Sequence, residues 1–170
     1  MEFPLVRMTI GYVVERDHLI MIHRNMNPDD IHYKMWIAPG GSLEGLELPD
    51  DCLRREFLEE TGLSLEDFYR IGVIHFDNTE HIRPNGKQFG FNAEVFLYGI
   101  NRTSGTMKLH DDKSNPIYRV PIQHVYTKPM HEGDRFLWAA IQQNWGKQFD
   151  AYIKHIGDKL DKKHSRIQFH

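Results

Sequence analysis

The amino-acid sequence predicts an α/β fold in which a mixed sheet is covered by helices on its faces. Segments with the apolar, β-branched composition of strands outnumber the segments with helical spacing. The helical segments fall between groups of strands, which is typical of layered α/β domains. The 170 residues contain no repeat and no low-complexity linker, and this length suits one hydrophobic core. We therefore expect a single domain over residues 1–170.

The predicted strands are bounded by turn residues. They are expected at residues 5–14, 19–23, 35–38, 69–76, 89–100 and 117–122, and in a terminal hairpin of residues 149–156 and 159–169. The turn Glu15-Arg16-Asp17 separates the first two strands, and Pro39-Gly40-Gly41 ends the third. Alternating apolar residues along the strand at 89–100 predict a face that packs in the core.

Two helices are predicted between these strands. The first covers residues 49–61, with Pro49 in its first turn and Gly62 just past its end, where these residue types are favoured. The second covers residues 132–145 and carries apolar residues on one side. Both helices are long enough to cover a face of the sheet.

Composition limits the partners. The net charge of −3 does not provide the basic field that duplex nucleic-acid binders use. A single cysteine, Cys52, excludes an intrachain disulfide framework and fits a reducing compartment. We read no signal peptide and no bilayer-spanning apolar run, so the expected location is the cytoplasm, without a membrane partner. A homodimer is one assembly that a domain of this size allows.

The segment GGSLEGLELPDDCLRREFLEETGL, residues 40–63, carries the strongest functional signal. Residues three and four apart share a helix face, so Glu56, Glu59 and Glu60 form one carboxylate patch. Hard divalent cations such as Mg²⁺ relieve the repulsion within such a patch and prefer oxygen ligands. Glycines before the helix let the backbone approach a ligand closely. The segment predicts a Mg²⁺ site facing an anionic substrate; the alternative is a solvated acidic face with Arg55 paired locally.

The spacing of the whole segment favours the metal site. From Gly41 the sequence reads Gly, five residues, Glu47, seven residues, then Arg55-Glu56-apolar-x-Glu59-Glu60-x-Gly62-apolar. This pattern resembles the signature of the Nudix hydrolases at every fixed position. Each residue type occurs at roughly 5–7%, so seven chance matches have a probability on the order of one in a million or less.

The resemblance implies an α/β/α sandwich around a mixed sheet and hydrolysis of a nucleoside diphosphate linked to another group. By position, Glu56, Glu59 and Glu60 match the family's metal-binding glutamates, with Mg²⁺ as the cofactor and Mn²⁺ as a substitute. Glu56 also matches the residue often assigned as the base or key ligand. Gly40 matches a glycine whose carbonyl contacts the metal, and Arg55 matches an arginine that orients the glutamates.

Two further stretches bear on the substrate. Residues 23–36 and 120–134 resemble the MutT-like branch of the family, which hydrolyses oxidised nucleoside triphosphates. This implies conversion of a nucleoside triphosphate, with 8-oxo-dGTP as a candidate, to nucleoside monophosphate and pyrophosphate. The alternatives are ADP-ribose, another nucleotide sugar or an RNA 5′ end as substrate, and a non-catalytic nucleotide sensor.

The same resemblance nominates substrate-binding residues, each with a plainer interpretation. Arg24 contacts the base or a phosphate, or is a surface residue at a strand end. Asp134 reads a purine edge, or is a first-turn residue stabilised by the helix dipole. His131 stacks on the base, although a loop histidine is more often only solvated. Trp36 lines the pocket or, more often for such a residue, packs in the core, and Gly41 lets the backbone approach the substrate.

This sequence departs from the branch at several positions. Ser42 stands where a lysine is usual, which weakens a phosphate contact, and Leu48 replaces the usual Ser or Thr helix cap. His131 replaces an aromatic residue of the base pocket, which puts a preference for 8-oxo-guanine in doubt. The late glutamate that often completes the metal site has no obvious counterpart, and Asp111 or Asp112 is the candidate for that role.

Overall fold

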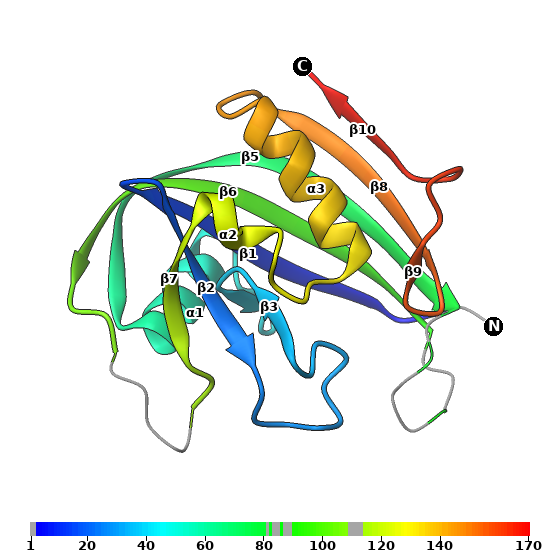
Figure 1. The fold of residues 1–170 in the computed structure, drawn as a ribbon, viewed down its shortest axis with the longest axis horizontal. Helices are drawn as coiled ribbons and strands as arrows, with labels where there is room; N and C mark the ends of the chain where they lie inside the picture. The colour runs from blue at the N-terminus through cyan, green and yellow to red at the C-terminus, as the bar shows by residue number, and fades with distance from the viewer. Residues whose placement is uncertain (1–2, 81, 83–85, 87–89, 109–113) are drawn as a thin grey trace.

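A strongly curved mixed sheet organises the computed structural model, which describes residues 3–80, 82, 86, 90–108 and 114–170 (Figure 1). Its strands are β1 (Leu5–Glu15), β2 (His18–Arg24), β3 (Met35–Ile37), β4 (Gly40–Ser42), β5 (Leu63–Glu80), β6 (Phe91–Gly105), β7 (Ile117–Pro121), β8 (Phe149–Ile156), β9 (Lys159–Leu160) and β10 (Arg166–Phe169). The main strand order is β10-β8-β5-β6-β1-β2-β3. The β1–β6 and β5–β8 pairs are parallel, whereas the adjacent pairs β1–β2 and β5–β6 are antiparallel. The sheet is therefore mixed, as predicted.

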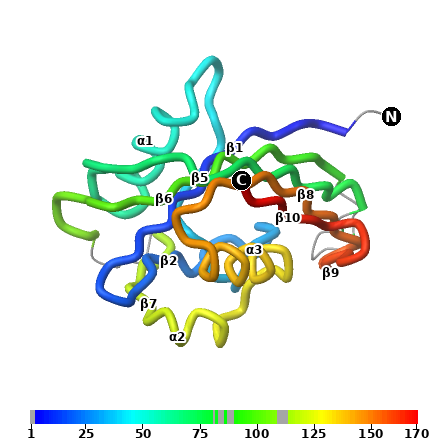
Figure 2. Tube along the Cα trace, turned by 90° about the horizontal axis from the view of Figure 1, so that it is seen from above, coloured from blue at the N-terminus to red at the C-terminus, as the bar shows by residue number. Residues whose placement is uncertain are grey.

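Helices cover both faces of the sheet. Helix α1 (Pro49–Thr61) packs on one face, and α2 (Ile122–Val125) and α3 (Glu132–Gln143) lie on the other (Figure 2). Leu53 and Phe57 of α1 join one buried cluster, and Trp138 and Ile141 of α3 join a second. Each helix buries an apolar stripe against the sheet, which supplies most of the stability of such elements. The predicted fold class is therefore confirmed.

The bounds of α1 agree with the sequence prediction. Leu48 occupies the N-cap position with an apolar side chain that cannot accept a hydrogen bond, so the helix start relies on Pro49 at N1. At the other end Gly62 has a φ of 77°, and its N–H donates to the Leu58 carbonyl at 2.9 Å. The backbone N–H of Lys108 donates to the Thr61 carbonyl, and the Lys108 ammonium donates to the Glu59 carbonyl.

Several elements differ from the prediction because they depend on distant partners. Residues 40–42 do not form a loop but pair as β4 with Met8–Ile10 of β1. Strand β5 begins at Leu63, directly after α1, because its first residues pair with the far end of β6 at Ser104–Gly105. The stretch 159–169 is not one strand, since residues 161–165 form turns before β10 returns to pair with β8.

Helix α3 and β7 also end earlier than predicted. Helix α3 stops at Gln143, two residues before the expected end, and β7 gives way to α2 at Ile122. The strand expected from residue 89 is described from Phe91 onwards and continues to Gly105. In the described part of the chain, no helix is long and apolar enough to cross a membrane.

Candidate active site

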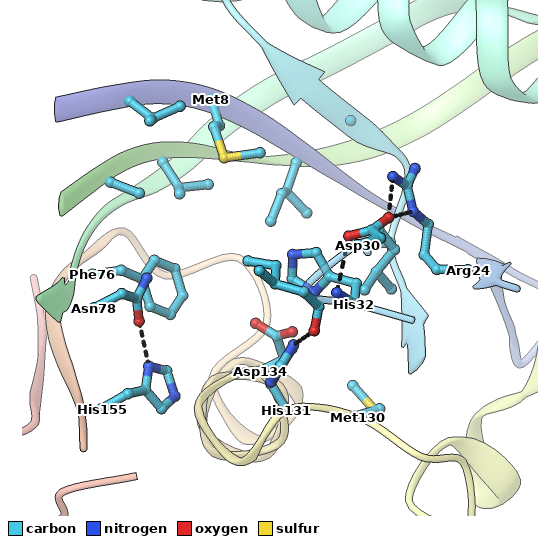
Figure 3. A pocket seen from close by; sticks show the side chains of 18 of the residues that line it. Met8, Arg24, Asp30, His32, Phe76, Asn78, Met130, His131, Asp134 and His155 are labelled. Carbon is cyan, nitrogen blue, oxygen red and sulfur yellow. Dashed lines mark hydrogen bonds and ion pairs between the residues drawn. The ribbon is translucent and has the colours of Figure 1, made fainter. Parts of the chain in front are cut away.

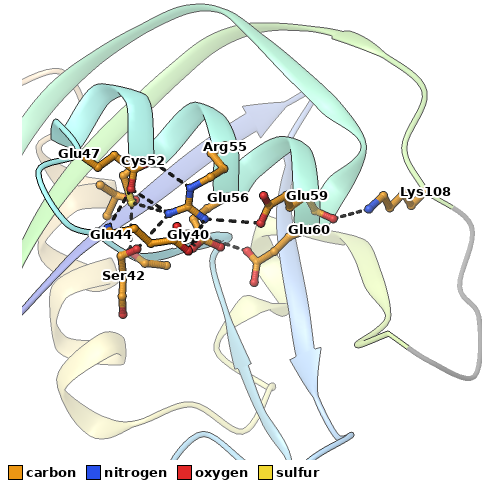
Figure 4. Close-up of polar contacts among 12 residues, drawn as sticks. Gly40, Ser42, Glu44, Glu47, Cys52, Arg55, Glu56, Glu59, Glu60 and Lys108 are labelled. Atoms are coloured by element: carbon orange, nitrogen blue, oxygen red, sulfur yellow. Dashed lines mark hydrogen bonds and ion pairs between the residues drawn. The ribbon is translucent and has the colours of Figure 1, made fainter.

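Arg55 organises the carboxylates along α1 (Figure 4). Its Nε and Nη2 atoms each lie 2.9 Å from an oxygen of Glu47, and its Nη1 lies 2.8 Å from Oε1 of Glu56. Glu59 is more loosely associated, with Oε2 at 3.5 Å from Nη1. The hydrogen bond from Arg55 lowers the pKa of Glu47 to about 2, and the same bonds raise the pKa of Arg55. Arg55 is thereby held in place and fixes the direction of the Glu56 carboxylate.

The two glycines of β4 bring the backbone against α1. A Cβ atom at Gly41 would lie 2.2 Å from Cδ of Glu56, so the absence of a side chain at this residue makes room for that carboxylate. A Cβ atom at Gly40 would lie 2.0 Å from the carbonyl oxygen of Thr9, and Gly40 has a φ of +151°. The glycine pair therefore serves two purposes: Gly40 permits pairing with β1, and Gly41 accommodates Glu56.

Glu60 is the most enclosed of the three glutamates. Its side chain is 19% exposed and accepts a hydrogen bond from the Gly40 N–H at 2.9 Å. Burial raises the pKa of Glu60 to about 7; the Gly40 N–H and Arg24 act against this shift, and Glu56 and Glu59 add to it. Nη1 of Arg24 lies 3.8 Å from the Glu60 carboxylate. A buried carboxylate beside two others favours an additional cation.

A cavity of about 330 Å³ lies next to this carboxylate cluster. Apolar side chains from the sheet form much of its wall, including Val6, Met8, Phe76, Phe91, Ala93 and Val95. Phe91, Ala93, Val95 and Leu97 of the predicted core face are buried, and the first three also line this cavity. Gly40 and Arg24 line the cavity and also contact Glu60, so the two regions are continuous.

Three of the predicted substrate-binding residues meet in the cavity. Arg24 lies at one end, and His131 and Asp134 come from the start of α3 (Figure 3). Of the residues that the structure describes, Trp36 and Gly41 stand apart from the cavity lining. The Trp36 ring stacks on His23 at 4.8 Å instead. The plainer interpretation, side-chain packing, therefore describes Trp36 in this structure.

Comparisons with known proteins agree with this geometry. Residues 5–138 match the family described as the NUDIX domain. The chain belongs to the Nudix family. Domains of this family bind nucleotide-derived small molecules, and most are pyrophosphohydrolases that use divalent metals.

Solved Nudix structures resemble the chain at low identity. A MutT protein from Bacillus halodurans has a TM-score of 0.76 and 21% identity, over 96% of this chain and 97% of that one. A MutT protein from Methanosarcina mazei Go1 has a TM-score of 0.66 and 16% identity, over 86% of this chain and 99% of that one. The NUDIX domain of Shewanella oneidensis NrtR, complexed with ADP ribose, has a TM-score of 0.61 and 11% identity, over 85% of this chain and 89% of that one. These likenesses confirm the predicted Nudix fold.

The donor chemistry of the site fits Mg²⁺. Glu56, Glu59, Glu60 and the Gly40 carbonyl offer hard oxygen atoms, and the negative charges of Glu56 and Glu59 add to the rise in the pKa of Glu60 that burial causes. Within the described ranges, no three acidic, histidine or cysteine side chains already surround a point that a metal could occupy. Arg55 holds Glu56, and the Gly40 N–H holds Glu60. The candidates Asp111 and Asp112 lie outside the described residues.

Replacing Glu60 with Gln is expected to stabilise the metal-free protein at alkaline pH. A carboxyl with a folded-state pKa of about 7, against a usual 4.5, stabilises the fold at low pH and loses that contribution as pH rises towards 7. At pH 8 the variant should gain on the order of 3 kcal/mol in unfolding free energy, and much less at pH 5. Urea unfolding of the wild type and the variant in EDTA, at pH 8 and at pH 5, measures the difference in unfolding free energy.

A matched control for that experiment lies one residue away. Glu59 has the same side chain on the same helix but is 61% exposed, so Glu59→Gln should change the unfolding free energy little at either pH. Adding Mg²⁺ should reduce the difference in unfolding free energy between the wild type and Glu60→Gln at pH 8, because a bound cation relieves the buried charge. Equal unfolding free energies at pH 8 in EDTA would contradict the assigned environment of Glu60.

Sequence reasoning missed several polar residues of the cavity lining, among them Asp30, Asn78 and His155. Asp30 accepts hydrogen bonds from Arg24 and from the backbone N–H of His32. Asn78 and His155 lie at the opposite end, hydrogen-bonded to each other (Figure 3). Asp30 could have been predicted as a partner of Arg24, since it is an acidic residue six positions further along the chain. Asn78 and His155 are 77 positions apart, and no local pattern joins them.

Proposed function

We propose that this Nudix protein is a Mg²⁺-dependent pyrophosphohydrolase that converts a nucleoside triphosphate to the monophosphate and pyrophosphate. The observation that carries the proposal is the continuity of the carboxylate cluster with the cavity through Gly40 and Arg24. A nucleotide has the same two parts, an anionic phosphate chain and an apolar ring. The phosphates would lie along the carboxylates with their cations, and the base would enter the cavity.

Hydrolysis needs a group that accepts a proton from the attacking water. Glu56 is suited to this, because Arg55 fixes its Oε1 at 2.8 Å and Gly41 leaves room for the carboxylate. The water oxygen forms a bond to phosphorus, the bond to the bridging oxygen breaks, and the water proton passes to Glu56. Bound Mg²⁺ would neutralise charge on the phosphates and make water more acidic.

Recognition of the base is assigned to the cavity end near α3. Its volume of about 330 Å³ lies at the lower end of the range for small-molecule pockets, roughly 300–1,000 Å³. Burial raises the pKa of the Asp134 carboxyl, with His131 acting in the opposite direction. Such a carboxyl can accept a hydrogen bond from the base when ionised, or donate one when protonated. His131 is fixed by a contact of 3.1 Å to the Ile31 carbonyl and borders the same space.

The MutT-like character of residues 23–36 and 120–134 places 8-oxo-dGTP first among the substrates. The test is release of pyrophosphate and phosphate with Mg²⁺ from dGTP, 8-oxo-dGTP, ADP-ribose and a triphosphorylated RNA. The proposal expects pyrophosphate from a nucleoside triphosphate, with 8-oxo-dGTP turned over fastest. Faster turnover of dGTP or another triphosphate would keep the reaction and overturn the oxidised-base preference.

ADP-ribose is the second candidate, because a structurally similar NUDIX domain is complexed with it. Release of AMP and ribose 5-phosphate from ADP-ribose, without turnover of triphosphates, would replace the first proposal with the second. Nucleotide binding by calorimetry without any product would instead indicate a sensor. Mn²⁺ should support the reaction in place of Mg²⁺, because both accept carboxylate oxygens.

A further inference from the structure

Four consecutive residues at the start of α3, residues 131–134, contact different parts of the molecule. The Nε2 atom of His131 lies 3.1 Å from the Ile31 carbonyl oxygen, in the loop between β2 and β3. Glu132 accepts a hydrogen bond from the backbone N–H of Leu160 in β9, at 2.9 Å. The first turn of α3 is thus attached to two separate elements, and the residue at its third position, Asp134, lies in the cavity.

The third attachment is a close contact between Gly133 and His155 of β8. A Cβ atom at Gly133 would lie 2.6 Å from Nε2 and 2.7 Å from Cε1 of His155, and 3.0 Å from Cγ2 of Ile153. Gly133 is buried and has an ordinary negative φ, so a glycine stands here for space rather than for conformation. Any larger residue would push the first turn of α3 away from the sheet or tilt the imidazole.

The imidazole of His155 is itself held firmly. It is 7% exposed, and its Nδ1 lies 2.8 Å from Oδ1 of Asn78 on β5. Because an amide oxygen only accepts, Nδ1 is the donor in this bond. The ring also lies nearly parallel to Phe76, at 7° and 6.0 Å between centroids. Strand β5, next to β8 in the sheet, therefore fixes the orientation of the ring against which α3 packs.

We propose that His155, held by Asn78, is a positioning residue that fixes Asp134 in the cavity through Gly133 and so determines which nucleobase is accepted. Asp134 directly follows Gly133, so a shift of the first turn moves its carboxyl by a similar amount. This inference rests on the proposed function in one respect, that the cavity receives the base. The carboxylate cluster at the other end of the cavity stays in place, so the chemical step should be affected much less than base selection.

The contact itself is tested by a double-mutant cycle. Gly133→Ala is expected to lower the thermal unfolding temperature because the new methyl group meets His155. Combining it with His155→Ala, which empties that space, should restore part of the loss, so that the two changes are strongly non-additive. Additive losses in the double variant would overturn the proposed contact. This measurement needs neither a substrate nor a metal.

The consequence for recognition is tested by binding and kinetics. Calorimetry with dGMP, 8-oxo-dGMP and dAMP gives the base selectivity without turnover. Gly133→Ala and His155→Ala are expected to reduce the selectivity ratio about 10-fold, within the range that pocket contacts supply, and to raise KM more than they lower kcat. Leu65→Ala is the matched control, because it removes a buried side chain in the other core cluster and should lower stability without changing selectivity.

The outcomes separate this inference from the proposed function. Unchanged base selectivity in both variants, with stability losses like that of Leu65→Ala, would overturn the positioning role and leave the hydrolase proposal intact. A wild type that binds the nucleotides selectively but hydrolyses none would overturn the hydrolase proposal. In that case, loss of selectivity in both Gly133→Ala and His155→Ala, without such a loss in Leu65→Ala, would still support the role of His155.

Discussion

Replacing Glu56 with Gln is expected to reduce turnover by about three to four orders of magnitude, because a positioned general base supplies roughly 10²–10⁴ and a metal ligand is lost as well. The fold should survive. The side chain is 18% exposed and lies outside both buried clusters, and Arg55 keeps its two bonds to Glu47. Steady-state kinetics at saturating substrate and Mg²⁺, together with thermal unfolding, measures both expectations.

Glu44→Gln is the matched control for this variant. Glu44 also approaches Nη1 of Arg55, at 3.7 Å, but it is 76% exposed and precedes α1. The same change of carboxylate to amide there should leave kcat within about twofold, because exposed ion pairs contribute little. A Glu56→Gln enzyme with near-normal kcat would remove Glu56 from the proposed role. A similar loss in Glu44→Gln would instead indicate that the net charge around Arg55 matters more than any single carboxylate.

The carboxylate cluster was predictable because its geometry is local. Helical spacing alone puts Glu56, Glu59 and Glu60 on neighbouring positions of α1, and the signature spacing places Arg55 among them. Pro49 and Gly62 likewise mark helix ends through their own backbone preferences. These features depend on residues within one or two helical turns of each other, so they do not depend on contacts with distant parts of the chain.

The cavity was less accessible to prediction because its members meet only after folding. Arg24, His131 and Asp134 were nominated by resemblance, and the fold brings them to one space. Among the described residues, Trp36 is not part of the cavity lining, and its ring stacks on His23 instead. The pairing of residues 40–42 with β1 escaped notice because glycine carries little strand preference, and its partner lies about 30 positions away.

Asp30 illustrates how the two halves of the site are joined. Its Oδ2 accepts from Nε of Arg24 at 2.8 Å, while Nη1 of the same arginine lies 3.8 Å from Glu60. The same guanidinium thus bonds Asp30 in the cavity lining and approaches Glu60 of the carboxylate cluster. Arg24 and the Gly40 N–H lower the pKa of Glu60, but burial outweighs them and raises it. The loop that carries Asp30 is thus linked to the carboxylate cluster through Arg24.

Gly41→Ala is expected to reduce kcat by about 10²-fold or more while leaving the unfolding temperature nearly unchanged, since misplacing a catalytic group by 1 Å can cost that much. The new Cβ would lie 2.2 Å from Cδ of Glu56 and within 2.5 Å of both carboxylate oxygens. The atoms in conflict are the end of a flexible side chain, so the carboxylate moves and the backbone does not. Kinetics and thermal unfolding of this variant separate its effect on the site from any effect on the fold.

Gly40→Ala provides the contrast, because its new Cβ would meet backbone atoms of Thr9 and Ile10 at 2.0–2.9 Å. That variant should lose stability, since the β4–β1 pairing cannot shift as a side chain can. Adding Gly41→Ala to Glu56→Gln should cost little further activity, because both changes act on the same carboxylate. A Gly41→Ala enzyme with wild-type kcat would mean that Glu56 works from another position than the one Arg55 gives it here. Full multiplication of the two losses would mean that Gly41 acts on the substrate directly, which is the role its place in the signature first implied.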